Sequence, residues 1–509
     1  MPSEHSSLED IRLEKVHRLR QMGIEPYPAR AERTHTTLQA IRAFEAAEAG
    51  GGDSTLRAIV VGRVRSMRPM GKITFAHVED GEGRLQLFLR VDEVGQEQLD
   101  MFNREYDLGD FVQAGGEMFR THTGEATLRV DEFRMLAKSV TPLPAAKDEM
   151  VEGEVVRHAT LSEPEVRYRQ RYADLAVNPQ VRDVFRARAA LIRALREFLD
   201  SRGFLEVETP ILQPLYGGAA ARPFTTYHNQ LKQELYLRIS FELYLKRLLV
   251  GNLERVYEIG RDFRNEGVDR THNPEFTMLE FYWAYADYHQ VMDFTEEMVV
   301  YAADRVLGKR VLTFQGREIN LEPPWPRVKL RDGLLELTGI DIDQHTSAEG
   351  LAAAMRARQL EADPKATRGK LIEDLLNDHL EPSLIQPTFL YDYPRDISPL
   401  TKSKPGDPDT VERFEGFIAG MELCNAFSEL NDPLDQEARF LEMMRDYAAD
   451  DEERHPLDED YLRAMRYGMP PNGGFGMGID RLAMLFTDSP NIREVILFPH
   501  LREREGKIE

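Results

Sequence analysis

Three glutamates lie among apolar neighbours, where an isolated charge is costly. Glu280 falls inside the apolar run 276–285, and Glu415 and Glu422 are each flanked by apolar residues. A buried carboxylate is stable only with a partner, so Glu280 either forms a structural ion pair with Arg264 or binds a cation. Two carboxylates in such a setting, Glu415 and Glu422, suit Mg²⁺. This ion takes one or two carboxylates and completes its octahedron with phosphate oxygens and water.

A predicted β-hairpin positions Glu280. The runs 256–263 and 276–285 have strand-like patterns and flank a polar stretch that contains Gly267, which is typical of an antiparallel hairpin with a long loop. Arg264 follows the first strand directly. Because side chains alternate between the two faces of a strand, we expect one face of the second strand to carry Phe276, Met278, Glu280, Tyr282 and Ala284.

The sequence FRNEGVDRTHNPEFTMLEFY at 263–282 resembles the second signature motif of the class II aminoacyl-tRNA synthetases, and it is most similar to the motif of the lysine enzymes. The resemblance implies that Arg264 binds both the α-phosphate of ATP and the carboxylate of the amino acid. It also implies three residues that hold the nucleotide, the last by stacking on adenine: Glu266, His272 and Phe276. Two more positions match the amino-acid pocket of the family: Glu280 and Tyr282.

Two other segments resemble the remaining signature motifs, and all three motifs occur in the family order. A predicted amphipathic helix at 181–202 and the strand after it at 204–210 resemble the first motif, which implies dimerisation. The glycine-rich strand and helix GGFGMGIDRLAMLF at 473–486 resemble the third motif, which implies that Arg481 binds the γ-phosphate. Taken alone, the first segment is also typical of any amphipathic helix, and the second of a common glycine-rich turn.

The resemblance extends to a metal site and to the rest of an amino-acid pocket. It implies that Glu415 and Glu422 are metal ligands, with about three Mg²⁺ ions per subunit between carboxylates and ATP phosphates, and that Glu415 also contacts ATP. Small residues at 217–224 allow a close backbone approach, although a structural tight turn is the alternative there. The further residues implied to bind the amino acid are Gly218, Glu242, Asn425, Phe427 and Glu429.

These implied ligands conflict with strict strand alternation. Counting along the strand, Asn425, Phe427 and Glu429 lie on one face and Glu422 lies on the other. If all four serve one site, the strand must contain a β-bulge, which we expect near residues 423–424.

The segment 55–144 has a different pattern, with five short strand-like runs separated by turn signals, at 58–68, 70–80, 81–90, 109–120 and 126–136. This pattern predicts a five-stranded oligonucleotide-binding barrel. Residues 57–90 carry seven basic and three acidic side chains, an excess of four positive charges in a chain whose net charge is −23. The overall charge argues against nucleic acid, but this local excess favours an RNA-binding surface.

Phe75 and Gln86 lie on successive predicted strands of this barrel and offer a stacking ring and an amide that can contact a base edge. The alternative is that Phe75 belongs to the barrel core. The lysine, aspartate and asparagine enzymes share an N-terminal barrel that binds the anticodon, so the resemblance implies that Phe75 and Gln86 contact its central uridine. Arg68 and Glu125 match further anticodon-binding positions.

Length and composition place these motifs in a multidomain α+β chain. At 509 residues, 42% of them hydrophobic, the chain exceeds one ordinary domain. Its single cysteine excludes an internal disulfide and a cysteine-based zinc cluster. No apolar run approaches about 18 residues and no signal sequence is present, so we expect a cytoplasmic protein without a membrane partner. The expected domains are a helical extension at 1–54, the barrel at 55–144, a linker at 145–170, and a catalytic domain at 171–509 with an antiparallel sheet flanked by helices.

The resemblance implies ATP-dependent attachment of L-lysine to tRNA(Lys) through a lysyl-adenylate, by a homodimer that needs no covalent nucleophile. Two alternatives remain. A ligase that attaches lysine to a protein would lack the barrel, and a non-catalytic tRNA-binding relative should have lost Arg264, Glu415, Glu422 or Arg481. The barrel pattern is present, which argues against the first alternative, and all four residues are present, which argues against the second.

Overall fold

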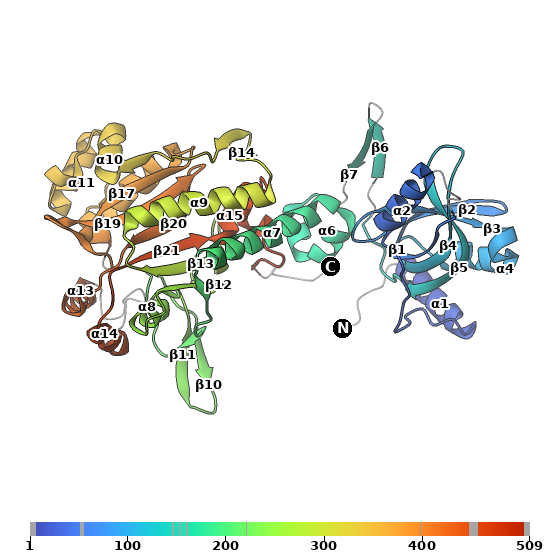
Figure 1. Cartoon of the computed structure of the whole chain (residues 1–509), viewed down its shortest axis with the longest axis horizontal. Coiled ribbons are helices and arrows are strands. Elements are labelled where there is room, and N and C mark those ends of the chain that lie inside the picture. Colours follow the sequence, from blue (N-terminus) through green and yellow to red (C-terminus); the bar gives the residue numbers. More distant parts are fainter. Residues whose placement is uncertain are drawn as a thin grey trace. The chain divides into compact units, whose positions relative to one another are not determined.

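The computed structural model describes residues 7–50, 55–144, 147–151, 154–158, 161–219, 221–398, 400–446 and 457–502. The chain divides into two compact units, Met1–Glu163 and Pro164–Glu509. In Figure 1 the first unit is drawn in blue and teal, and the second runs from green to red.

The first unit is built on a closed five-stranded barrel, as the sequence predicts. Its strands follow one another around the barrel in the order β1-β2-β3-β5-β4. Alternate side chains fill the interior, so that Ala76 and Val78 are buried while Phe75 and His77 are only partly buried. The strands are β1 Arg57–Met70, β2 Ile73–Glu79, β3 Arg84–Arg90, β4 Phe111–Arg120 and β5 Ala126–Ala137.

Four helices accompany the barrel: α1 Ser7–Gln21, α2 Thr37–Ala49, α3 Val91–Val94 and α4 Gln96–Glu105. The sequence pattern does not predict α3 and α4. In α4 only Leu99, Met101 and Phe102 are buried apolar residues, too few to show a helical period in a ten-residue segment. Part of the expected linker is also ordered, as a two-stranded sheet of β6 Lys147–Val151 and β7 Glu154–His158.

The second unit is built on a nine-stranded sheet in the order β16-β17-β19-β20-β21-β13-β12-β8, with the short β18 paired to β19. The pairs β16–β17 and β12–β8 are parallel, and the other pairs are antiparallel. The strands are β8 Leu205–Glu206, β12 Arg255–Phe263, β13 Glu275–Ala284, β16 Arg327–Lys329, β17 Thr388–Pro394, β18 Ser403–Lys404, β19 Asp407–Ile418, β20 Met421–Ser428 and β21 Asn472–Gly478.

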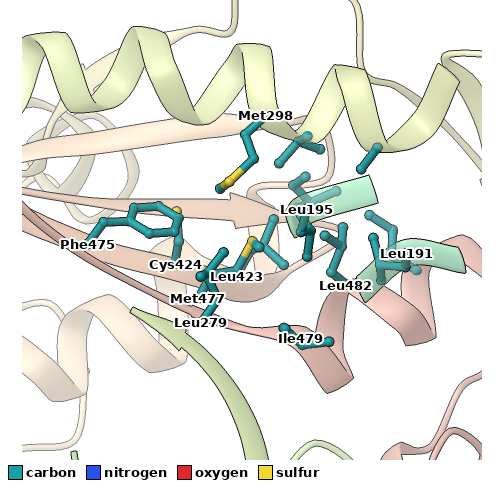
Figure 2. Packing of buried hydrophobic residues seen from close by; sticks show 14 of the residues in the cluster. Leu191, Leu195, Leu279, Met298, Leu423, Cys424, Phe475, Met477, Ile479 and Leu482 are labelled. Atoms are coloured by element: carbon teal, nitrogen blue, oxygen red, sulfur yellow. The ribbon is translucent and has the colours of Figure 1, made fainter. Parts of the chain in front are cut away.

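The predicted hairpin is confirmed as β12 and β13, and its second strand has two different faces. Leu279 and Phe281 are buried in the main core of the unit, whereas Glu280 and Tyr282 point to the opposite face of the sheet and line a cavity. Figure 2 shows the core side, where Leu279 lies with side chains from α7 and α9. The core therefore fixes one face of the central strands and leaves the other for a site.

The predicted helix at 181–202 is confirmed as α7, Pro179–Ser201, which packs its apolar face on the core. A second helix beside this core, α9, Tyr288–Val306, begins with a capping box of Asp287 and Gln290. A third helix, α15 Ile479–Phe486, follows β21 directly and supplies Leu482 to the same core (Figure 2).

The predicted β-bulge is confirmed. Gly416 of β19 pairs with Cys424 of β20, but the next residue, Phe417, pairs with Glu422, so Leu423 is the extra residue. Because of this bulge, Glu422 and Asn425 line the same cavity despite their three-residue spacing.

The other elements of this unit are helices and small strands at its periphery. Residues 328–417 contribute a separate apolar core, which contains Leu334, Leu351 and Leu371. Within the described ranges, no helix has both the length and the apolar character needed to cross a membrane. The remaining elements are α5 Pro164–Arg169, α6 Arg171–Val177, β9 Leu212–Gln213, β10 Thr225–His228, β11 Gln233–Leu237, α8 Glu242–Val250, β14 Val311–Phe314, β15 Arg317–Asn320, α10 Leu330–Thr338, α11 Ala348–Ala357, α12 Arg368–Leu375, α13 Pro433–Asp446 and α14 Glu459–Arg466, with short 3₁₀ or π turns at Ile342–Gln344, Leu376–Leu380, Glu381–Ser383, Arg395–Ile397 and Ile492–Glu494.

Candidate active site

A cavity of about 430 Å³ lies on the face of the sheet opposite the main core. It is bounded by β13, β20 and β21 and by the start of α8. Gly474, Gly476 and Gly478 of β21, the strand between β13 and β20, line its floor. Because these residues have no side chains, the space above β21 stays open. The cavity brings together these predicted site residues: Gly218, Glu242, Arg264, Glu266, His272, Phe276, Glu280, Tyr282, Glu422, Asn425, Phe427, Glu429 and Arg481.

One end of the cavity is acidic. Glu242, Glu280 and Glu429 are all buried there. Glu280 accepts hydrogen bonds from Ser240 Oγ at 2.9 Å and from Tyr282 Oη at 3.2 Å. The structural ion pair of Glu280 with Arg264 is therefore not formed, and within the described ranges the donors to Glu280 are neutral. Burial, reinforced by the nearby carboxyls of Asp262 and Glu242, raises the pKa of Glu280 well above its ordinary value.

Lys246 supplies a cation at this acidic end that the sequence does not reveal. Its Nζ donates to Glu242 Oε1 at 2.9 Å and also to Glu429 Oε2, and its side chain has no exposed surface. A glutamate and a lysine four residues apart on a helix normally indicate an exposed pair. The signal that points to burial is the apolar composition of the helix around them, LYLKRLLV.

The other end of the cavity carries arginines. Arg481, on α15, donates from Nη1 to the backbone oxygen of Glu422 at 2.6 Å and to its Oε2 at 3.2 Å, and from Nη2 to His272 Nε2 at 2.9 Å. Arg264 lies over the ring of Phe276, 5.2 Å from its centroid. Cations and an aromatic face at one end suit phosphates and a stacked base.

The two predicted metal ligands lie on neighbouring strands. Glu422 lines the cavity, and although burial disfavours its charge, Arg481 and Arg413 hold its pKa below the ordinary value. Glu415 is not part of the lining. It accepts hydrogen bonds from Arg413 Nη2 at 2.6 Å and from Tyr393 Oη at 2.8 Å, and burial raises its pKa to about 7. Within the described ranges, no group of three or more acidic, histidine or cysteine side chains is arranged to hold a metal by itself.

Arg413 is a second residue that sequence reasoning misses. It lines the cavity, and besides Glu415 it contacts Asn425, donating from Nε to Oδ1 at 3.0 Å. It therefore joins an implied amino-acid ligand to an implied metal ligand. Its position two residues before Glu415, on the same strand face, is the signal that the sequence offers.

The predicted anticodon residues gather on the outside of the barrel. Gln86 Nε2 donates to Glu125 Oε2 at 2.8 Å, and Arg68 pairs across the strands with Phe75. The ring of Phe75 is 5.0 Å from that of Phe88 and is not part of the barrel core. The core alternative for Phe75 is therefore wrong.

His77, which the sequence reading does not single out, belongs to the same surface. Its Nε2 is 3.1 Å from Glu125 Oε1, and its Nδ1 is 2.8 Å from Ser66 Oγ. Burial, helped by the nearby guanidinium of Arg84, lowers the pKa of His77. The surface thus combines the aromatic rings of Phe75 and Phe88 with hydrogen-bonded polar side chains.

Comparison with known proteins agrees with both units. Residues 163–502 match the family model of class II tRNA synthetases (D, K and N), and residues 58–136 match that of the OB-fold nucleic acid binding domain. A lysine–tRNA ligase from Chloroflexus aurantiacus is 52% identical over 99% of this chain and 100% of its own length. Those from Roseiflexus castenholzii and Moorella thermoacetica are 53% and 52% identical, over 99% and 97% of this chain and 100% and 98% of their own lengths. The chain therefore belongs to the class II tRNA synthetases of the D, K and N group and, within that group, to the lysine–tRNA ligase family.

Proposed function

We propose that the protein attaches L-lysine to tRNA(Lys) in two steps at the cavity of the second unit. The lysine carboxylate attacks the α-phosphorus of ATP and pyrophosphate leaves, and then a 3′-terminal hydroxyl of the tRNA takes the lysyl group. The observation that carries this proposal is one cavity with three buried carboxylates at one end and Arg264 and Arg481 at the other. That arrangement complements a diamino acid joined to a nucleotide.

The chemistry needs positioning and neutralisation of charge rather than a nucleophile from the protein. Arg264 contacts the α-phosphate and the lysine carboxylate, so it brings the two reacting groups together. Phe276 stacks on adenine, with Glu266 as a further nucleotide contact. Arg481, held by Glu422 and His272, neutralises charge on the γ-phosphate.

The second unit also fits a divalent cation. Glu415 and Glu422 lie on adjacent strands, and Glu422 faces the cavity. Mg²⁺ takes one or two carboxylates from a protein when phosphates fill its other positions. About three Mg²⁺ ions per subunit, bound together with ATP, would neutralise the phosphate oxygens.

Lysine is selected by the buried acids. Lys246 neutralises only one of the charges of Glu242 and Glu429, and Glu280 is bonded to neutral donors. An amino acid with a neutral side chain would leave the remaining buried negative charge without a cation, which is costly. Gly218, Asn425 and Phe427 complete the lysine site, and Tyr282 holds Glu280 in place through its hydroxyl.

The barrel binds the anticodon of tRNA(Lys). Support comes from the outward position of Phe75 and from Gln86, which lies beside Glu125 on the same surface with an amide suited to a base edge. Arg68 is exposed next to Phe75 and can pair with a phosphate. The reaction takes place in the cytoplasm, where charged tRNA is consumed.

The working form is a homodimer with twofold symmetry. Support comes from large apolar side chains that are exposed on β8, at the end of the nine-stranded sheet, and on or beside β9 of the three-stranded sheet: Leu205, Ile211, Leu212 and Leu215. Such a patch is expected to be covered by an equivalent patch. Sedimentation at micromolar concentration should give a species of twice the chain mass, and a monomer alone would refute the dimer.

The function itself is tested by ATP–pyrophosphate exchange with each of the twenty amino acids. Lysine alone should support exchange at a rate well above background. Exchange with another amino acid and not with lysine would overturn the proposal, as would no exchange at all.

A further inference from the structure

Lys246 on α8 is a cation inside the acidic end of the cavity, and its burial needs an explanation. Its side chain has no exposed surface, and the ring of Tyr461 lies 5.8 Å from its Nζ. A lysine is almost never fully buried unless it is paired. The two carboxylates that it contacts, Glu242 and Glu429, are implied substrate ligands, so the ammonium group can act on the amino-acid site through them.

Within the described ranges, Lys246 binds one oxygen of each acid. It donates to Glu242 Oε1 and Glu429 Oε2. Glu429 Oε1 is buried without a hydrogen-bond partner within the described ranges. It lies only 1.8 Å from where a Cβ on Gly474, a cavity-lining residue, would be. An unsatisfied buried acceptor is costly, and here it is oriented toward the cavity, where a donor on a ligand can reach it.

The charges at this end also match a particular class of ligand. Three carboxylates face one ammonium, because Glu280 is bonded to neutral groups while Glu242 and Glu429 share Lys246. When the acids are ionised, two negative charges remain. A diamino acid brings two ammonium groups, and its carboxylate is taken by Arg264 at the other end.

We propose that Lys246 is a positioning and specificity-determining residue of the amino-acid site, which orients Glu242 and Glu429 so that the site accepts a substrate with two ammonium groups. Lys246 does not touch the substrate and acts through the two acids. This inference rests on the proposed function, because it takes lysine as the substrate.

The site has a predictable response to pH when Lys246 is removed. Burial raises the pKa of Glu242 and of Glu429, and the Lys246 ammonium opposes this in both. Without the ammonium the pKa of each acid rises further, so a larger share of the acids is protonated at a given pH and must release protons before lysine binds. Lysine affinity should therefore rise more steeply with pH in the variant than in the wild type. The other titratable or charged groups facing this cluster are Glu280, Tyr282, Tyr461 and Arg247; none of them can replace the contact of Lys246 with both acids.

The test compares full-length wild type with Lys246→Met in ATP–pyrophosphate exchange between pH 6.5 and 8.5. Removing a group that orients a ligand-binding side chain costs about 10- to 100-fold in metal sites, and we expect the lysine KM at pH 7 to rise by a similar factor. The ATP KM should stay within about threefold. The lysine KM of the variant should fall steeply toward pH 8.5, and its preference for lysine over norleucine, a neutral isostere, should shrink.

Lys138→Met is the matched control. Lys138 has no exposed side-chain surface and is bonded to two carboxylates, Asp107 and Asp110, but it lies in the barrel unit. It should lose stability in the same way while both KM values stay near wild type. Lys246→Arg keeps a cation and should keep the wild-type pH profile. If Lys246→Met does not fold, Lys246→Gln, which is neutral but keeps a donor, is measured in its place with the same expectation.

A lysine KM and pH profile equal to wild type in Lys246→Met or Lys246→Gln would overturn this inference. So would equal rises in the lysine and ATP KM values, because they would indicate a general loss of structure. Lysine-dependent exchange by the wild type tests the proposed function, and the comparison of wild type with the Lys246 variants tests the role of Lys246. A failure of the proposed function is therefore distinguishable from a failure of this inference.

Discussion

Gly474→Ala is the smallest change that should disable the amino-acid site. Gly474 lies in β21 between β13 and β20, paired to Tyr282 on one side and Phe427 on the other. A Cβ at this position would come within 1.8 Å of Glu429 Oε1 and 2.6 Å of Tyr282 Cε1. Real Cβ atoms essentially never come so close to another heavy atom, and the strand is held from both sides, so the glutamate must move.

The expected loss of lysine affinity depends on how far the Glu429 carboxylate can move. Its other oxygen is bonded to the buried Lys246, so displacing the carboxylate strains a buried ion pair. Inserting a methyl group into a well-packed site typically costs about 1–3 kcal/mol, which corresponds to about 5- to 150-fold in affinity at about 1.4 kcal/mol per factor of ten. We expect the lysine KM to rise by this factor, while ATP binding at the arginine end is little changed.

Gly476→Ala is the control, because it adds the same methyl group to the same face of the same strand. Its Cβ would meet Met278 Cε at 3.3 Å and Glu280 Cγ at 3.6 Å, and a methionine end can give way at little cost. The assay is ATP–pyrophosphate exchange with varied lysine and varied ATP. If Gly474→Ala kept a wild-type lysine KM, the assignment of Glu429 to the lysine site would be wrong. If Gly476→Ala were impaired as strongly, a methyl group anywhere on the cavity floor, rather than the displacement of Glu429, would explain the loss.

Three further substitutions test separate parts of the account. Arg264→Ala should reduce exchange by about 10²–10³-fold, since a donor that stabilises developing charge is worth that much; a rate within about threefold of wild type would refute its role. Glu280→Gln removes a buried charge without changing shape, so it should raise the lysine KM far more than the ATP KM, and equal effects would place Glu280 outside the lysine site. Phe75→Ala should lower the efficiency of tRNA charging by about 5- to 150-fold, because a stacked base is worth about 1–3 kcal/mol. Since Phe75 is only partly buried, its melting and exchange should match wild type, and an unchanged charging rate would remove it from the anticodon site.

The parts of the structure that the sequence predicts depend on local patterns. Alternation along residues 276–284 places Glu280 and Tyr282 on one face and Leu279 and Phe281 on the other, as observed. Asp287 followed three residues later by Gln290 marks the start of α9. The bulge at Leu423 follows from a conflict between strand alternation and the implied ligands. Each of these inferences needs only a few neighbouring residues.

The parts that the sequence does not predict depend on contacts between distant segments. From the sequence, Lys246 is expected to be an exposed partner of Glu242. In the structure it is buried and also bonded to Glu429, 183 residues away. Arg413 gains its role from contacts with Glu415 and Asn425 that arise only when β19 and β20 pair. Tertiary contacts decide both cases, and the local pattern gives only a weak signal: an apolar helix around Lys246, and the position of Arg413 on the same strand face as Glu415.

The central claim is tested most directly by charging an unfractionated tRNA pool with the wild-type protein, ATP and each of the twenty amino acids in labelled form. The account predicts that lysine alone becomes attached to tRNA, and that the charged fraction consists of tRNA with lysine anticodons. Attachment of another amino acid, or lysine-dependent exchange without any transfer to tRNA, would contradict it.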